Sequence, residues 1–432
     1  MNPELRRNLW LELTLHRMLA LPIALALLFM LVGSWSEDPR PALATTASLL
    51  FVGFALWGAI QVGDSVMGEA RGRTWDAQRM SALEPWTMTW GKLAGAPAYA
   101  WFGSAICLVV HVAASPGRSA LKMAVFMLCG TVLLHALALI GSVIASRKAV
   151  GRSSSTAWVL VLVLVVVGPW MSVASSGDSD IVWWGNGRAR FNFVLVSTAV
   201  FAGWAVFGAH RVMCEELRVR TTPWAWVGFL LFVSAYISGF GIRAQDTLGQ
   251  QRNVLLIAGL IVTLVAAYPL LFTEATGAMT VRRMLLRARA RDWRRFLQET
   301  PLWPVTLAMA VPFCLLTVVL AGPRGKEDEY LRAAVLAPLP LLLFAVRDAA
   351  LYLFFALAKA PRRAEATMLF YLLLAYWLVP MLLNAAGMKA LSELVLPRFW
   401  DRPGYAAFVM AVQAAGMVAA ALWRWRRNYG TH

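Results

Sequence analysis

Residues 69–93 read EARGRTWDAQRMSALEPWTMTWGKL, and this polar, amphiphilic stretch separates two long apolar runs. Elsewhere the chain alternates between apolar segments and short basic loops. A helix needs about 20 apolar residues to cross the roughly 30 Å hydrocarbon layer of a membrane, and most of the apolar segments approach that length. The alternation predicts a polytopic helical membrane protein, in which residues 69–93 are the part best suited to meet a soluble partner.

The composition of the 432-residue chain favours the same class. Hydrophobic residues make up 59% of it and charged residues 15%, with a mean hydropathy of +0.62. Soluble domains have apolar and charged shares nearer one half and one quarter. The net charge of +17 would favour nucleic acid as the partner of a soluble chain, but membrane proteins gather basic residues in cytoplasmic loops. We therefore expect no nucleic-acid partner and attribute the charge to topology.

The apolar segments predict an all-α fold with about twelve transmembrane helices. They lie at 18–35, 43–66, 93–114, 121–146, 157–175, 193–213, 223–242, 253–273, 303–321, 334–356, 368–388 and 405–423. An even number of spans puts both termini on one side, and roughly 26 Lys and Arg fall on that side against about 13 on the other. Both termini are therefore expected in the cytoplasm, with the chain in a bacterial inner membrane.

The spans are predicted to form two six-span halves, because the loop pattern recurs at an offset of about 205 to 215 residues. In each half the longest cytoplasmic loop follows the second span, beginning at Glu69 and at Glu274. The predicted organisation is an interfacial amphipathic helix at 1–17, a first half at 18–213 with its loop at 68–92, a linker at 214–222, and a second half at 223–432 with a basic cytoplasmic loop at 275–302.

The first loop carries an ordered set of residues: Glu69, Arg71, Gly72, Thr74, Asp76, Leu83, Pro85, Gly91 and Lys92. This order resembles the loop between the second and third spans of the type-2 ABC exporter permeases. That loop reads Glu-Arg-x-x-Gly-Thr, a short helix, a Pro and then Gly-Lys, whereas here Arg73 intervenes between Gly72 and Thr74. The resemblance covers residues 69–93 and implies a permease subunit of an ATP-driven exporter.

In that family the loop forms a coupling helix that docks into an ATPase and passes its motion to spans two and three. Thr74 is a competent N-cap for a helix through Ala82, which would present Trp75, Met80 and Leu83 beside Asp76 and Arg79. Pro85 would end this helix, and Lys92 would anchor span three at the level of the lipid phosphates. The ATPase-coupling residues are thus expected to be Glu69, Arg71, Gly72, Thr74, Trp75, Asp76, Arg79, Leu83, Pro85, Gly91 and Lys92. An ordinary basic loop held by lipid headgroups is the alternative.

The resemblance places ATP and Mg on a separate cytoplasmic P-loop ATPase, because this chain has no nucleotide-binding motif of its own. The nearest approach, residues 322–326, lacks the Walker A spacing and the following Ser or Thr. The substrate is unidentified, and the aromatic-rich composition suits an amphiphilic or lipid-like one. Membrane lipids and further permease or periplasmic subunits are the other expected partners.

The second basic loop has two open interpretations. Its residues Glu274, Arg287, Arg291, Trp293 and Arg294 would form either a second docking surface or an interfacial helix attracted to anionic lipid, at about 1 kcal/mol per basic residue. The two are compatible.

Ionisable residues inside spans are costly, and so are candidates for function. Arg347 and Asp348 lie in the middle of the tenth span and, being about 100° apart around a helix, are expected to face different neighbours. They suit a polar cavity, a proton relay or interhelical packing, whereas for His135 an interhelical hydrogen bond is favoured. We predict no catalytic residue, and the five His and four Cys show no metal-binding spacing.

Two other classes of protein remain open. A secondary transporter of the major facilitator type also has two sets of six spans, but its loop after span two is shorter and its central linker longer. A membrane-embedded transferase would need an acidic or histidine cluster in a large external loop, for which Asp178, Asp180 and Asp401 are thin evidence.

Overall fold

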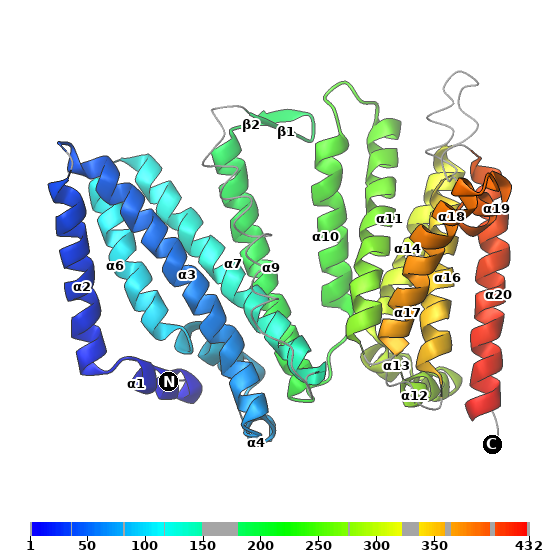
Figure 1. Ribbon diagram of the computed structural model, residues 1–432, viewed down its shortest axis with the longest axis horizontal. Helices are drawn as coiled ribbons and strands as arrows, with labels where there is room; N and C mark the ends of the chain where they lie inside the picture. Colours follow the sequence, from blue (N-terminus) through cyan, green and yellow to red (C-terminus); the bar gives the residue numbers. More distant parts are fainter. Residues whose placement is uncertain are drawn as a thin grey trace. The chain divides into compact units, whose positions relative to one another are not determined.

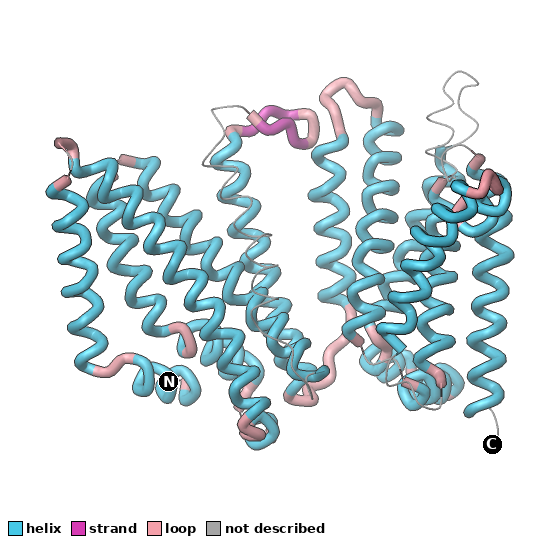
Figure 2. The backbone as a smooth tube through the Cα atoms, in the orientation of Figure 1, coloured by secondary structure: helices cyan, strands magenta, loops and turns pink. Residues whose placement is uncertain are grey.

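The computed structural model describes residues 2–35, 37–80, 83–115, 117–148, 180–274, 277–321, 337–358, 364–397 and 402–429. Within these ranges the chain is mostly helical (Figure 2), and β1 (Ile181–Trp183) pairs with β2 (Asn186–Arg188). Ten of the described helices are long and apolar enough to cross a membrane, or eleven if the bent pair Pro85–Gly95 and Ala98–Ala114 is one span. The chain is an all-α, multi-pass membrane protein.

The predicted spans coincide with these helices, except that residues 157–175 lie outside the described part of the chain. The third predicted span is the bent pair, whose two parts meet at an angle of 55°. The described residues divide into two compact units, which are treated separately below.

The first unit comprises Met1–Ile181 and Gly187–Thr221. Its described helices (Figure 1) are α1 (Pro3–Glu12), α2 (Leu15–Ser34), α3 (Pro39–Arg71), α4 (Trp75–Arg79), α5 (Pro85–Trp90), the π-helix η1 (Gly91–Gly95), α6 (Ala98–Ala114), α7 (Arg118–Lys148) and α9 (Arg190–Glu216). Helix α3 packs against α6 and α7, and α7 packs against α9. Small residues line these interfaces, among them Ala47, Ala55, Ala59 and Ala136, and they let the helices approach closely.

Cys214, Glu215 and Glu216, predicted to open the linker, instead continue α9. Arg147 of α7 explains why the helix extends this far. Its Nε donates to Glu216 Oε1 over 2.5 Å, and one of its terminal nitrogens lies 3.1 Å from Glu215 Oε2. The last turn of α9 is therefore bound to α7 by two carboxylates.

The second unit comprises Val182–Asn186 and Thr222–His432. Its described helices are α10 (Trp224–Gly241), α11 (Leu248–Thr273), α12 (Ala278–Arg289), α13 (Trp293–Glu299), α14 (Leu302–Ala321), α16 (Pro338–Ala356), α17 (Ala364–Leu373), the π-helix η2 (Leu374–Leu378), α18 (Val379–Ala385), α19 (Lys389–Val395) and α20 (Pro403–Tyr429). Helix α11 packs against α10 and α14, and α16 packs against α20.

Candidate functional site

Residues 69–74 form a sharp turn at the end of α3. Helix α3 continues past its apolar part to Arg71, and Figure 1 shows α4 beyond the end of α3, on the same side of the unit as α1. Arg73 adopts a left-handed backbone conformation (φ 56°), and the amide of Thr74 donates to Glu69 O at 3.0 Å. Helix α3 therefore ends beside a left-handed residue, and three residues separate its end from the start of α4. We call residues 71–80 the elbow.

The short helix of the elbow differs from the predicted one. Helix α4 spans only Trp75–Arg79, and Ala82 lies outside the described residues. Thr74 does not cap the helix with its side chain, because it already has helical backbone angles and its Oγ1 bonds back to Glu69 O at 3.3 Å. Pro85 does not end α4; it is the first residue of α5, where a missing N–H costs nothing.

The apolar residues of the elbow are not all presented to a partner. Trp75 is buried (6% exposed), and Leu83 packs against the core of the first unit, so the expectation that both face outward is wrong. Met80 is 83% exposed, and the Asp76 side chain is 79% exposed. Arg71, Gly72, Arg73, Thr74 and Ala77 are exposed as well. The outer surface of the elbow is thus charged, with one large apolar side chain.

Side-chain contacts attach the elbow to two long helices. Gln78 Nε2 donates to Glu69 Oε1 of α3 at 2.6 Å. Arg79 Nε donates to the backbone oxygen of Glu216 in α9 at 3.2 Å, and it lies 3.5 Å from the Glu216 carboxylate. Because Glu216 is also bound by Arg147, α4 is connected through α9 to α7. A displacement of α4 would therefore move α3 and α9 directly.

Lys92 is buried rather than anchored among lipid phosphates. Its side chain is 1% exposed, and Nζ lies 2.6 Å from Glu69 Oε2, 3.4 Å from Glu4 Oε1 and 3.3 Å from Ser65 O. Arg7 adds a second cation, 3.2 Å from Glu4 and 3.0 Å from Glu69. The prediction failed because two carboxylates attract the ammonium group inward. We call Glu4, Arg7, Glu69 and Lys92 the inner ion cluster.

Helix α1 supplies half of this cluster, a role that the sequence did not reveal. Glu4 and Asn8, four residues apart on one helical face, are both buried. Asn8 Nδ2 donates to Gly91 O at 3.1 Å, and a Cβ at Gly91 would overlap the Glu4 side chain. Trp10, on the rest of α1, is 80% exposed. The polar face of α1 packs on the protein, and the i, i+4 pair of polar residues was the available signal.

The second basic loop begins with a comparable but simpler junction. The carboxylate of Glu274, just after α11, accepts hydrogen bonds from Leu302 N at 2.9 Å and Trp303 N at 3.1 Å, at the start of α14. Between these ends, α12 and α13 contain no buried residue. Arg287 lies 3.5 Å from Glu299, Arg291 has a left-handed backbone (φ 55°), Trp293 is 60% exposed and Arg294 is exposed.

Arg347 and Asp348 form the centre of a polar network inside the second unit. Both are buried, and the Arg347 guanidinium donates to Asp348 Oδ1 at 3.1 and 3.2 Å. The two residues bond each other, because the long arginine side chain folds back onto the adjacent carboxylate. As expected, each also has a neighbour of its own, since only Asp348 bonds Tyr268 of α11 and only Arg347 bonds Gln413 of α20. Asp348 Oδ2 also accepts from Tyr268 at 2.8 Å and from Tyr376, while Arg347 donates to Gln413 Oε1 at 2.5 Å.

This network joins four segments of the second unit. Tyr268 belongs to α11, the ion pair to α16, Tyr376 to η2 and Gln413 to α20. A buried charge pair costs more free energy to desolvate than it recovers unless additional hydrogen bonds satisfy it, and here the tyrosines and the glutamine supply them. The sequence pointed to the ion pair but not to its three uncharged partners.

His135 makes the favoured interhelical bond. It lies in α7 with Nε2 3.1 Å from Ala55 O of α3, and its ring stands edge-on to Trp101 at 5.1 Å. Gly58 of α3 leaves room for the ring, since a Cβ there would overlap it. The described residues contain no group of three or more His, Cys, Asp or Glu that could hold a metal ion. Residues 322–326, Asp178 and Asp401 lie outside the described part of the chain.

No family model, no curated protein and no solved structure matches the chain.

Proposed function

We propose that the chain is the permease subunit of an ATP-driven exporter of the type-2 ABC class, with twelve spans in two six-span halves and both termini in the cytoplasm. A separate P-loop ATPase binds ATP and Mg and docks on the elbow. The observation that carries the proposal is the attachment of an exposed, charged elbow to two transmembrane helices.

The elbow suits a mechanical contact because its outer and inner surfaces differ. Outside, Arg71, Arg73, Asp76 and Met80 are available to a soluble protein. On its inner surface, the Trp75 side chain is buried, and Lys92 Nζ lies 5.8 Å from the centre of the Trp75 ring. A partner that pushes on such a surface moves a rigid body rather than a loop, since packed interiors transmit displacement. Motion would reach α3 through Glu69 and α9 through Arg79.

The arrangement supports the resemblance but gives the buried residues another role. Lys92, Glu69 and Trp75 hold the elbow in place, whereas Asp76, Arg73 and Met80 are the residues that would contact the ATPase. Substitutions of the first group are expected to reduce coupling with the partner still bound, and substitutions of the second group to reduce binding itself.

A site-specific photo-crosslinker in place of Met80 tests the proposal in native membranes. The matched control is the same crosslinker at Leu248, which is 84% exposed at the start of α11. We expect a crosslink from position 80, and none from position 248, to a polypeptide that is labelled by an azido-ATP analogue. Absence of any ATP-binding partner at position 80 would contradict the proposal.

One observation favours a secondary transporter as the second candidate. The ion pair of Arg347 and Asp348 lies inside a transmembrane helix, where ionisable groups often belong to proton or ion pathways. The purified chain, reconstituted alone in vesicles, distinguishes the two candidates. Substrate flux driven by a pH gradient without ATP would support the secondary transporter, and flux that needs a co-purified ATPase would support the exporter.

A further inference from the structure

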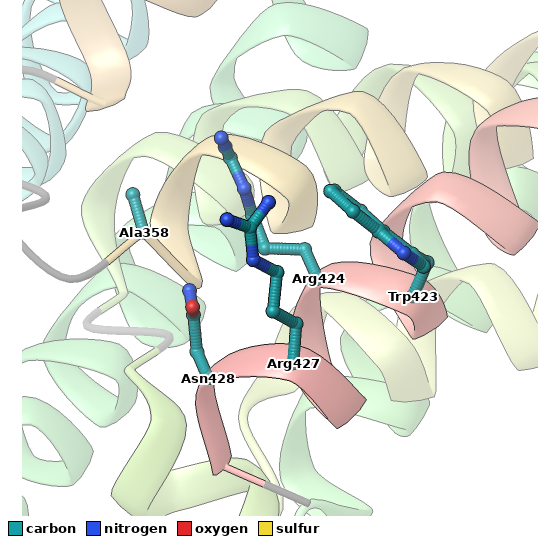
Figure 3. Close-up of a pocket in the computed structure, with 5 residues that line it drawn as sticks. All are labelled: Ala358, Trp423, Arg424, Arg427 and Asn428. Carbon is teal, nitrogen blue, oxygen red and sulfur yellow. The ribbon is translucent and has the colours of Figure 1, made fainter.

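Basic residues near the C-terminal end of α20 line a pocket. The pocket has a volume of about 310 Å³ and is lined by Ala358, Trp423, Arg424, Arg427 and Asn428. Figure 3 shows the two guanidinium groups between Trp423 on one side and Ala358 and Asn428 on the other. We call it the tail pocket. It shares no residue with the elbow, the inner ion cluster or the network around Arg347.

The wall of the tail pocket is held by hydrogen bonds to the end of α16. Arg424 donates to Phe354 O at 2.7 Å, and its guanidinium lies 3.8 Å from the centre of the Phe354 ring. Asn428 Nδ2 donates to Leu357 O at 2.9 Å, and the Tyr429 hydroxyl donates to Ala358 O at 3.4 Å. The last carbonyls of a helix carry partial negative charge that repels anions. Here donors from α20 cover three carbonyls at this end, which reduces the repulsion.

The charge of the tail pocket is positive. Arg424 and Arg427 both enter it, no lining residue is acidic, and among the described residues neither arginine forms an ion pair. Arg427 is positioned by the Trp423 ring, with 5.2 Å between its guanidinium carbon and the ring centre. Two guanidinium groups that line one open pocket repel each other, and an anion bound between them would offset this repulsion. Arginine binds phosphate through two parallel hydrogen bonds, which makes a phosphate group the matching ligand.

The surroundings identify the source of that phosphate. The pocket lies at the end of the membrane-crossing helix α20, and Leu422 and Trp423 beside it are 51% and 55% exposed. Exposed tryptophan next to basic residues is typical of the lipid headgroup level. Acyl chains would cover Leu422 while the headgroup phosphate reaches the arginines. We propose that the tail pocket binds the phosphate of an anionic phospholipid. This inference is independent of the exporter proposal.

Native mass spectrometry of the purified full chain tests this, with phosphatidylglycerol titrated as the probe and phosphatidylcholine, which is zwitterionic and has no net charge, as the comparison. Arg427→Gln removes a lining guanidinium, and Arg426→Gln is the matched control, since Arg426 is exposed on the next position of α20 and does not line the pocket. We expect Arg427→Gln to weaken phosphatidylglycerol binding about fivefold or more, as loss of one basic contact predicts, and Arg426→Gln to weaken it less than twofold.

Arg427→Lys provides a second variant, which keeps the positive charge but loses the planar guanidinium group that can form two parallel hydrogen bonds to phosphate. An intermediate affinity is expected, and the melting temperature of each variant in detergent checks that the fold is intact. Equal losses for Arg426→Gln and Arg427→Gln would overturn the proposal in favour of general surface attraction. Equal binding of the two lipids would also overturn it, and so would displacement of phosphatidylglycerol by millimolar inorganic phosphate, which would indicate a site for free phosphate.

Discussion

Two glutamates, Glu69 in the first unit and Glu274 in the second, lie where the longest cytoplasmic loop of each half is predicted to begin. Each binds the beginning of the next membrane helix, but by different means. Glu69 pairs with the buried ammonium group of Lys92, and Glu274 accepts two backbone N–H bonds at the start of α14. The loop after Glu69 folds onto its unit through Trp75, whereas α12 and α13 after Glu274 bury nothing.

The difference shows that holding two helices together is one property of these loops, and connecting them rigidly to a further helix is another. Both glutamates hold two helices together, but only the first junction continues into a packed elbow with contacts to a further helix. The second leaves a basic, amphipathic layer exposed, which is suited to lipid or to a weak protein contact. We expect a displacement of α12 to leave the long helices of the second unit in place, because α12 and α13 bury no residue. We expect a displacement of α4 to move α3 and α9, to which it is bonded.

The largest expected effect comes from removing the buried cation. Lys92→Met leaves Arg7 as the remaining cation of the inner ion cluster beside the Glu4 and Glu69 carboxylates. Breaking a buried pair in this way typically costs about 3–5 kcal/mol. We expect that loss in the free energy of unfolding, measured by denaturant titration in detergent micelles. The double variant Lys92→Met with Glu69→Gln should recover more than half of it. A loss below about 1 kcal/mol would remove the contrast between the two junctions.

Close packing of α1 predicts the next effect. Gly91→Ala places a methyl group where the Glu4 side chain lies, and overpacking of this kind costs about 1–3 kcal/mol. Gly277→Ala, at the N-cap of α12 in the second loop, meets nothing within 4 Å and should cost less than about 1 kcal/mol, since alanine is only a poorer cap there. The same titration measures both variants, and equal effects would show that the two loops are packed alike.

A smaller effect is expected at the second junction. Glu274→Ala leaves two N–H groups of α14 without their acceptor, and loss of a helix cap costs about 0.5–2 kcal/mol. Glu299→Ala in α13 is the control, because its pairing with Arg287 is partly exposed and should contribute less than about 1 kcal/mol. If Glu274→Ala lowers the free energy of unfolding as much as Lys92→Met does, Glu274 must make stabilising interactions beyond capping the start of α14.

The smallest effect is expected on the exposed surface of α12. Arg283→Gln should change the unfolding free energy by less than about 0.5 kcal/mol, since the residue is exposed and its Nε donates to Met279 O of its own helix. Thermal melting in detergent checks this. A clear loss would mean that α12 packs against something in the membrane-embedded protein.

Hydropathy predicted the spans well because it depends only on the local run of apolar residues. It placed the second span at 43–66, whereas α3 runs from Pro39 to Arg71. The polar residues after the apolar run simply continue the helix out of the membrane, where hydropathy has no information. The bend of the third span lies between Gly95 and Ala98, where Pro97 precedes α6. Proline is a common cause of a kink, but a hydropathy profile does not use that signal.

The candidate sites were predicted less well, because burial of a charge depends on partners that are distant in sequence. The sequence predicted Lys92 to be a surface anchor, because nothing in it indicates that Glu4 lies beside the ammonium group. Arg347 and Asp348 stood out as charges within an apolar run, but Tyr268, Tyr376 and Gln413 are ordinary residues in a membrane helix. Uncharged partners of this kind carry no signal in a single sequence.

The burial of Lys92 also gives the protein a built-in reporter. An amine-reactive reagent can modify a lysine only while its nitrogen is accessible, and with 1% exposure that requires the inner ion cluster to open. The rate at which Lys92 is acylated, relative to an exposed lysine of the same chain, therefore counts how often α1 and α3 separate at this end. Any ligand or partner that moves the elbow would change that rate before transport itself is measured.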